Sequence, residues 1–279
     1  MSAPRIGLAL GGGAARGIAH IPMLEAFDEL GLKPARIAGT SFGALVGAAY
    51  ASGISAVEIR EHTIEVLGNR IDAARRLFEG AGTRVWDLFD FAGLNKVRID
   101  GVVLTDMVLP DGTASAVNKT EIPLAIIASD MTAQEEVVIT SGDMREAVAA
   151  SIGLPGLIQA PRLGGRLLVD GALTNPVPFD RVNGGTDLVV AVDVIGGRVP
   201  EEENETASNF QLALRSLYLM QHQIAELRRR EVDPQILIRP AIDHIRAGEF
   251  FKVREIMAAA KPAKEELKRK LAASLDGSG

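Results

Sequence analysis

Cysteine is absent from the 279 residues of this chain. Disulfide frameworks, zinc–thiolate sites and cysteine nucleophiles are therefore excluded. A chain without cysteine fits a reducing compartment, so we expect a cytoplasmic location. Aromatic residues are scarce as well, at 4% of the chain, so that any local concentration of them is informative.

Long apolar runs and an excess of positive charge are missing too. A membrane-spanning helix needs about 20 consecutive apolar residues, and no stretch of this sequence reaches that length. Residues 1–5 have neither the basic start nor the apolar run of a signal peptide. Any contact with a membrane is therefore expected to be peripheral. The formal net charge of −6 argues against nucleic acid as a partner.

Core-forming sequence is plentiful, because hydrophobic residues make up 47% of the chain. Short apolar runs alternate with helical periodicity from the start, which predicts an α/β fold with a parallel sheet and right-handed crossovers. No repeat or linker divides the sequence. We therefore expect a single domain over 1–279, with a helical extension at about 207–275.

The apolar patterns place each element approximately. Strands are expected at 5–10, 37–38, 122–129, 136–140, 187–195 and 235–239, and helices at 14–30, 55–78, 143–150, 207–230 and 253–275. The first helix contains Pro22, which removes a backbone hydrogen bond, so we expect a kink there. Residues 157–169 resemble a hairpin around Gly164 and Gly165. Residues 200–208, rich in glutamate, are expected to form an exposed loop.

The stretch 36–51 organises the chain. It runs from a short apolar strand through Gly-Thr-Ser-Phe-Gly at 39–43 into an alanine-rich helix. Gly-x-Ser-x-Gly at a strand-to-helix junction is the nucleophile elbow, in which the serine occupies a strained turn. Its hydroxyl projects at the N-terminus of the following helix, where the helix dipole favours developing negative charge. Ser41 is therefore a candidate nucleophile.

A loop of three glycines, Gly11, Gly12 and Gly13, follows the first strand. A dinucleotide site would need a glycine at the sixth position, where Arg16 stands, and an acidic residue after the second strand. A phosphate-binding P-loop would need lysine after its last glycine, but Gly17 is followed by isoleucine. Two interpretations stay open: an oxyanion hole of backbone N–H groups, or a tight turn that serves packing alone.

A serine nucleophile needs a base, and none of the four histidines is convincing. In α/β-hydrolases the histidine comes last, which would make His244 the candidate, but it lies in a charged stretch that we expect to be exposed. His20 projects from the first helix near an apolar face, where a hydrogen-bonded structural role is favoured. His62 and His222 are expected on helix surfaces.

Asp170 is a better candidate for the base. It follows the apolar run Leu-Leu-Val and precedes Gly-Ala, so its carboxylate should emerge where a strand ends in a tight turn. The local pattern alone favours an Asx-turn, which Asp-Gly pairs form readily. A catalytic role is the alternative that this pattern leaves open.

Four sequence blocks together resemble the patatin-like phospholipase family. They are Gly-Gly-Gly-Ala-Ala-Arg-Gly at 11–17, Gly-Thr-Ser-Phe-Gly at 39–43, Ala-Ser-Ile-Gly-Leu-Pro at 150–155 and Asp-Gly-Ala at 170–172. The resemblance covers about 5–196 and is greatest to the small bacterial single-domain members. It implies a three-layer α/β sandwich with a mostly parallel central sheet.

The resemblance also implies a function. It is hydrolysis of carboxylic ester bonds in lipids through a Ser–Asp dyad and an acyl-enzyme, without metal or organic cofactor. By motif position, the resemblance makes Ser41 the nucleophile and Asp170 the base. It assigns the oxyanion hole to the backbone of Gly11, Gly12, Gly13 and Ala14. Many members have glycine in place of Ala14, and N–H donation survives this change if the local φ is negative. Arg16 could add positive charge near the oxyanion or anchor the loop, and we expect anchoring.

Two other functions stay open: a carboxylesterase or thioesterase for non-lipid substrates with the same dyad, and a catalytically idle, lipid-binding scaffold.

One further segment bears on how the protein reaches a lipid substrate. Residues 85–94 hold Trp86, Phe89 and Phe91 among few polar groups. We expect them to pack in the core, as most such clusters do. The alternative is a mobile flap that covers the acyl site and touches the lipid surface.

Overall fold

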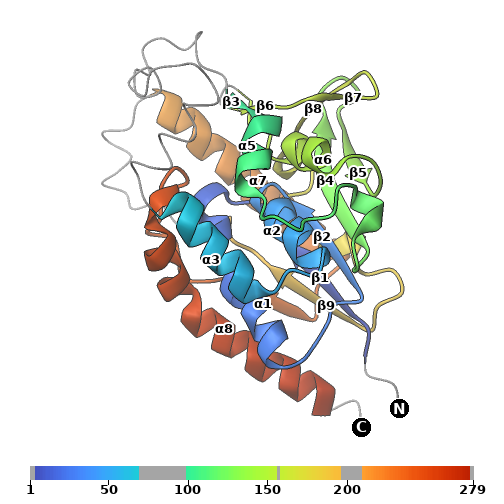
Figure 1. The fold of residues 1–279 in the computed structure, drawn as a ribbon, viewed down its shortest axis with the longest axis vertical. Helices are drawn as coiled ribbons and strands as arrows, with labels where there is room; N and C mark the ends of the chain where they lie inside the picture. Colours follow the sequence, from blue (N-terminus) through green and yellow to red (C-terminus); the bar gives the residue numbers. More distant parts are fainter. Residues whose placement is uncertain (1–3, 69–98, 156–157, 196–208, 277–279) are drawn as a thin grey trace.

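The fold is built on a central sheet. The structure, a computed structural model, describes residues 4–68, 99–155, 158–195 and 209–276. Five strands of the sheet run parallel: β1 (Ile6–Leu10), β2 (Arg36–Thr40), β4 (Leu124–Asp130), β9 (Leu188–Val192) and β10 (Ile236–Ile238). They lie in the order β10-β9-β1-β2-β4 (Figure 1). The prediction of a mostly parallel sheet is confirmed.

The sheet ends on an antiparallel edge. There β4 pairs with both β8 (Arg166–Asp170) and β5 (Glu135–Ile139), and β8 pairs with β7 (Arg162–Leu163). The turn between β7 and β8 has φ of 58° at Gly164 and 80° at Gly165. Two consecutive positive φ angles suit a tight hairpin turn and favour glycine. The predicted hairpin is confirmed, and its return strand carries Asp170 to the carboxyl end of β4.

One face of the sheet is covered by several helices that form the first outer layer: α1 (His20–Glu29), α2 (Phe42–Ala51), α3 (Ala56–Leu67) and α8 (Val253–Asp276). Because side chains alternate along a strand, β1 presents Ile6, Leu8 and Leu10 to this layer, and none is more than 2% exposed. Towards the antiparallel edge this layer continues as α5 (Gly101–Val108) and α6 (Met144–Ser151). Beside them, β3 (Ile99–Asp100) and β6 (Ile158–Gln159) form a separate short sheet.

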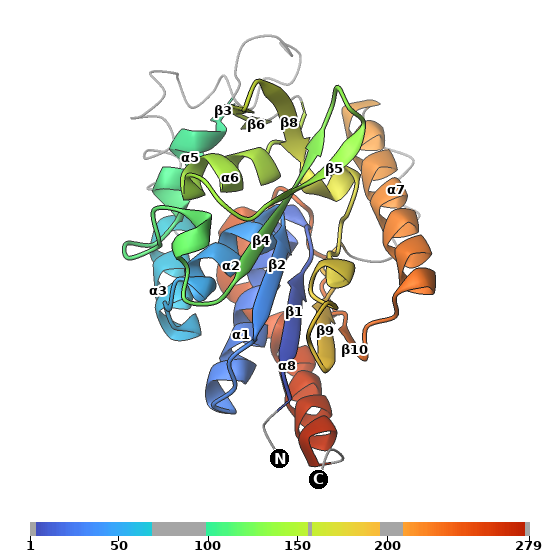
Figure 2. The ribbon, with the colours of Figure 1, turned by 90° about the vertical axis from the view of Figure 1, so that its right-hand side faces the viewer.

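The opposite face is covered by α7 (Asn209–Glu231) and a short 3₁₀ helix, η5 (Phe179–Arg181), which completes three layers (Figure 2). Here β1 and β2 present the small residues Gly7, Ala9 and Ala38. A Cβ on Gly7 would lie 2.6 Å from the carbonyl oxygen of Val182. The small side chains therefore let the segment after β8 lie close against the sheet.

The prediction of one continuous helix at 14–30, kinked at Pro22, is wrong in its first part. Residues Ala14–Ala19 form a 3₁₀ helix, η1, and the α-helix begins only at His20. Pro22 thus stands in the first turn of α1, where backbone N–H groups have no intrahelical acceptor. The discontinuity lies at the junction of η1 and α1, before the proline.

The helices expected at 143–150, 207–230 and 253–275 are confirmed as α6, α7 and α8, close to the expected bounds. No helix was expected where α5 lies. Some expectations fall on residues that the structure does not describe. The second part of the helix expected at 55–78, the aromatic segment 85–94 and the loop 200–208 all lie outside the described residues.

Candidate active site

Ser41 stands between β2 and α2 in a backbone conformation that few residues other than glycine adopt, with φ of 53° and ψ of −124°. The flanking glycines are sterically required. A Cβ on Gly39 would lie 2.6 Å from the carbonyl oxygen of Gly43, and a Cβ on Gly43 would lie 2.2 Å from that of Leu10. The Ser41 N–H donates to the Ser151 hydroxyl at 2.8 Å. The geometry is that of a nucleophile elbow.

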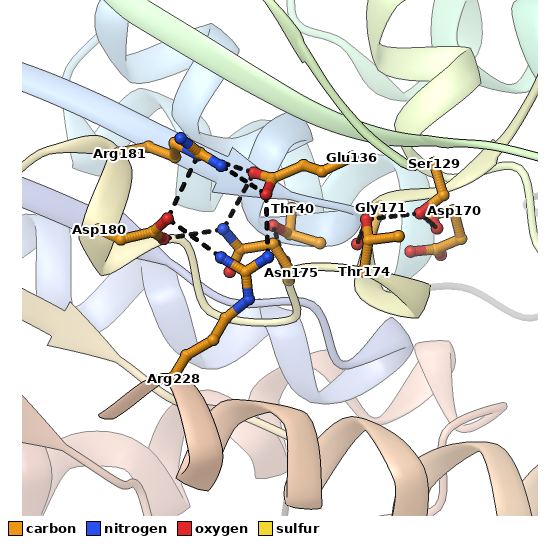
Figure 3. A network of polar contacts seen from close by, with 10 residues as sticks. All are labelled: Thr40, Ser129, Glu136, Asp170, Gly171, Thr174, Asn175, Asp180, Arg181 and Arg228. Carbon is orange, nitrogen blue, oxygen red and sulfur yellow. Dashed lines mark hydrogen bonds and ion pairs between the residues drawn. The ribbon is translucent and has the colours of Figure 1, made fainter. Parts of the chain in front are cut away.

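Asp170 lies at the end of β8 and faces this elbow. The Ser41 hydroxyl donates to its Oδ2 at 2.7 Å, and the Ala172 N–H donates to its Oδ1 at 2.8 Å. The Asx-turn and the contact with the serine therefore coexist, one on each carboxylate oxygen. The Ser129 hydroxyl donates to the Asp170 carbonyl oxygen at 2.9 Å (Figure 3). The Asp170 N–H donates to the Gly153 carbonyl at 3.0 Å. These backbone contacts hold the carboxylate in place.

Burial changes the proton affinity of this carboxylate. Desolvation raises the pKa of Asp170 to about 6, against smaller lowering contributions from the hydrogen bonds of Ala172 and Ser41. Within the described part of the chain, Asp170 forms no ion pair. A carboxylate with such a pKa is a stronger base than an exposed one and is still mostly ionised at neutral pH.

The glycine loop divides into two parts. The N–H groups of Gly11 and Gly12 already donate to the carbonyls of Val192 and Pro176, at 3.0 and 2.9 Å. Gly13 and Ala14 instead line a cavity that also contains Ser41. Ala14 has φ of 49°, so the negative φ assumed for the alanine is wrong. This conformation costs an alanine of the order of 1 kcal/mol.

Arg16 is the anchor of this loop, as expected. It is only 8% exposed, and its guanidinium donates to the carbonyls of Ile245 and Ile195. It also lies over the ring of Tyr218, 5.7 Å from the centroid. The arginine therefore ties the glycine loop to the segments after β9 and β10 and to α7.

None of the four histidines lines the cavity. His20 is fully buried, and its Nε2–H donates to the Gly11 carbonyl at 2.7 Å. Desolvation lowers the pKa of His20 to about 4, so the ring is neutral at pH 7. His244 is exposed and lies 3.8 Å from Glu255. His20 thus has the structural role that its apolar surroundings predict.

The cavity is small, about 30 Å³, close to the volume of one water molecule. Its lining unites distant segments: Gly13, Ala14, Ser41, Leu154, Asp170, Ala172, Leu217, Tyr218 and Gln221. The last three come from α7 and were not among the predicted site residues. The only sequence signal for them is their i, i+1 and i+4 spacing, which puts them on one helix face.

Beyond the cavity, a charged network surrounds the loop that follows Asp170. Glu136 of β5 contacts Arg181 at 2.7 Å and Arg228 of α7 at 3.0 Å, and Arg228 contacts Asp180 at 3.0 Å. The Asn175 side-chain amide donates to both Glu136 and Asp180 (Figure 3). The Asn175 carbonyl accepts from Thr40, next to the nucleophile. The network therefore joins α7 to the elbow.

The family model described as Patatin-like phospholipase matches residues 8–182. The chain belongs to the patatin-like phospholipase family. The match includes Ser41 and Asp170 and ends before α7.

Relatives of this patatin-like chain are mostly longer. An uncharacterized NTE family protein of Mycobacterium tuberculosis is 33% identical over 220 residues, 77% of this chain and 57% of the relative. Neuropathy target esterase sws of Drosophila melanogaster is 31% identical over 193 residues, 68% of this chain and 13% of the relative. The chain thus spans less than two thirds of the length of these curated relatives.

Two solved structures are similar over most of the chain at low sequence identity. VipD from Legionella pneumophila matches 96% of this patatin-like chain and 67% of its own, with a TM-score of 0.48 and 15% identity. Human GIVD cytosolic phospholipase A2 matches 98% of the chain and 60% of its own, with a TM-score of 0.46 and 12% identity.

Proposed function

We propose that this protein hydrolyses carboxylic ester bonds of lipids, with Ser41 as nucleophile and Asp170 as base. One observation carries the proposal: the Ser41 hydroxyl donates to Asp170 at 2.7 Å, at a strained elbow that faces a cavity. Membership of the patatin-like phospholipase family supports the lipid substrate. The single domain expected over 1–279 is part of this proposal.

The reaction proceeds in two steps. Ser41 Oγ attacks the ester carbonyl carbon while its proton passes to Asp170 Oδ2, and that proton then leaves with the departing alcohol. Water next attacks the acyl-enzyme, again giving its proton to Asp170, which returns it to Ser41 as the fatty acid departs. The hydrogen bond already joins the two atoms between which the proton moves.

The oxyanion formed in each step needs donors. The N–H groups of Gly11 and Gly12 are engaged with carbonyls, and the positive φ of Ala14 does not meet the condition for donation by its N–H. We therefore narrow the predicted oxyanion hole to the N–H of Gly13. Each such donor is worth roughly 2.7–4 kcal/mol in comparable sites. The N-terminus of α2, directly after Ser41, adds a favourable dipole.

Serine-directed labelling tests the proposal. A fluorophosphonate should label the wild-type protein on the peptide that contains Ser41 and should leave Ser41→Ala unlabelled. Labelling at another serine would place the nucleophile elsewhere, and no labelling would favour the idle scaffold. For the labelled enzyme, turnover of aggregated phospholipid and of soluble short esters separates a lipid hydrolase from a carboxylesterase or thioesterase.

A lipid hydrolase must contact the lipid surface that contains its substrate. In the described ranges no helix is long and apolar enough to cross a membrane. We propose peripheral contact with lipid, and the cytoplasmic location expected from the sequence stays a prediction. The segment 85–94, expected to be either core or flap, lies outside the described residues.

A further inference from the structure

The helix that covers the candidate active site has an exposed apolar outer face. On α7, Leu212, Leu219, Met220 and Leu227 are 43%, 62%, 51% and 56% exposed. At 100° per residue all four fall within about a quarter-turn of the helix. Five other large apolar residues of the described segments are 39–51% exposed, and they belong to several different elements. We call these four residues of α7 the outer stripe.

The inner face of α7 belongs to the site. Leu217, Tyr218 and Gln221 line the cavity with Ser41 and Asp170. Figure 2 shows α7 along one side of the molecule, with the sheet between it and α8. The outer stripe is thus separated from the nucleophile by the thickness of one helix.

The formal charge of α7 is opposite in sign to that of the whole chain. The helix carries four arginines and two glutamates, whereas the whole chain has a formal net charge of −6. Arg230 is exposed at the end of the stripe and forms no ion pair within the described residues. An apolar stripe with exposed arginine matches a surface of acyl chains and anionic head groups.

We propose that the outer stripe of α7 is the surface by which this protein docks on an anionic phospholipid surface. The inference rests on the proposed function, because the occupant is the aggregate that contains the substrate. Docking through this face would bring the cavity under α7 to the lipid. A second copy bound at the same place would instead cover the approach to the site.

The inner face also indicates that α7 changes position when a lipid enters. A cavity of about 30 Å³ is too small for an acyl chain. Gln221 is 5% exposed, and its Oε1 has no hydrogen-bond partner among the residues that the structure describes. A buried, unpaired amide oxygen destabilises the closed arrangement. Displacement of α7 would therefore break fewer polar contacts than displacement of a fully hydrogen-bonded cover.

Vesicle sedimentation tests the proposal independently of catalysis. The protein used is Ser41→Ala, with vesicles of equal parts phosphatidylglycerol and phosphatidylcholine. Adding L219S and M220S should weaken binding at least tenfold, and adding Leu227→Ser alone should weaken it less. Met131→Ser and Val103→Ser are matched controls, since both residues are 51% exposed and belong to other elements, the turn after β4 and α5. They should leave binding unchanged.

Three results would overturn the docking proposal. They are absence of vesicle binding by the Ser41→Ala protein, an equal loss of binding in the control variants, and equal binding to vesicles of phosphatidylcholine alone. A dimer that L219S and M220S dissociate without change in vesicle binding would assign the stripe to contact between copies. Thermal unfolding of each variant checks the fold. Fluorophosphonate labelling of the catalytic protein tests the proposed function separately, so either idea can fail alone.

Discussion

The carboxylates of Asp170 and Glu136 lie beside the same loop, but their pKa values shift in opposite directions. Asp170 begins the loop after β8 and is buried against a hydroxyl and a backbone N–H, so desolvation raises its pKa to about 6. Glu136 contacts the far end of that loop. Burial raises its pKa too, but hydrogen bonds from Arg181 and Asn175 and the charges of Arg181 and Arg228 outweigh this, and its pKa lies below its usual range.

The difference lies in the partners, since both groups are removed from water. A carboxylate with cationic partners is held ionised and serves as a structural tie. One without them keeps a higher proton affinity and can exchange a proton with its neighbour. The loop therefore begins at the proposed base and is held at its far end by Glu136 of β5.

Replacing the nucleophile should have the largest effect. Ser41→Ala is expected to lower ester turnover about 10⁴-fold or more, because no other group can form the acyl-enzyme. The fold should persist, since a small residue replaces a small one. Retention of more than a few per cent of turnover, measured as kcat on a soluble ester, would place the nucleophile elsewhere.

Removing only the base is the next test. Asp170→Asn is nearly isosteric but cannot accept the serine proton, so kcat should fall about 10³–10⁴-fold. His244→Ala is the control and should be near wild type, since His244 is exposed and lies outside the cavity lining. Equal damage from the two substitutions would favour a Ser–His–Asp triad.

The pH profile follows from the raised pKa of Asp170. The base must be ionised, so kcat/KM should be level above pH 6 and fall tenfold per unit below it. A profile that breaks near pH 4 would mean that the carboxylate is solvated in the working enzyme. One that breaks near pH 7 would point to histidine.

The same shift predicts a stability cost of the active site. Because the folded pKa of Asp170 is raised, protonation favours folding, and this contribution is lost as pH rises through about 6. The ionised group then costs about 3 kcal/mol at pH 8. Asp170→Asn should therefore raise the free energy of unfolding at pH 8, by about 1–3 kcal/mol. Denaturation at pH 4 should show little difference, and an equal gain at both values would contradict the assignment.

The structural carboxylate should show the opposite dependence. Glu136→Gln should lower stability by about 1 kcal/mol at pH 7, since its arginine partners are partly exposed. Its folded pKa is lowered, so its contribution is present above pH 4.5 and is lost as pH falls through the folded value. Denaturant unfolding at pH 7 and pH 3 measures this. Turnover should change less than threefold, and a collapse of turnover would assign Glu136 to the site.

The residues that were predictable from sequence are those marked by local geometry. Ser41 is framed by glycines that the close approach of Leu10 and Ala44 requires, and Asp170 stands at a strand end before a glycine. The blocks also carried the family resemblance, which belongs to the same first two thirds of the chain. Local motifs thus contained most of the candidate site.

What could not be predicted depends on tertiary contacts. Which glycine N–H groups are engaged is decided by the carbonyls of Val192 and Pro176, which come from distant segments. The positive φ of Ala14 has no local signature either, and the helical spacing of Tyr218 and Gln221 does not show that they cover this cavity. These features depend on how α7 and the sheet come together, and the sequence shows only that both exist.

The placement of the chain ends bears on how the protein can be handled. β1 begins and α8 ends at the lower end of the views in Figures 1 and 2, whereas Ser41 follows the carboxyl end of β2, away from that end. A purification tag, a fluorophore or a fused partner attached to either end of this chain would therefore sit away from the cavity that Ser41 and Asp170 line. The molecule could be tethered to a sensor surface by its ends with its working side facing the solution.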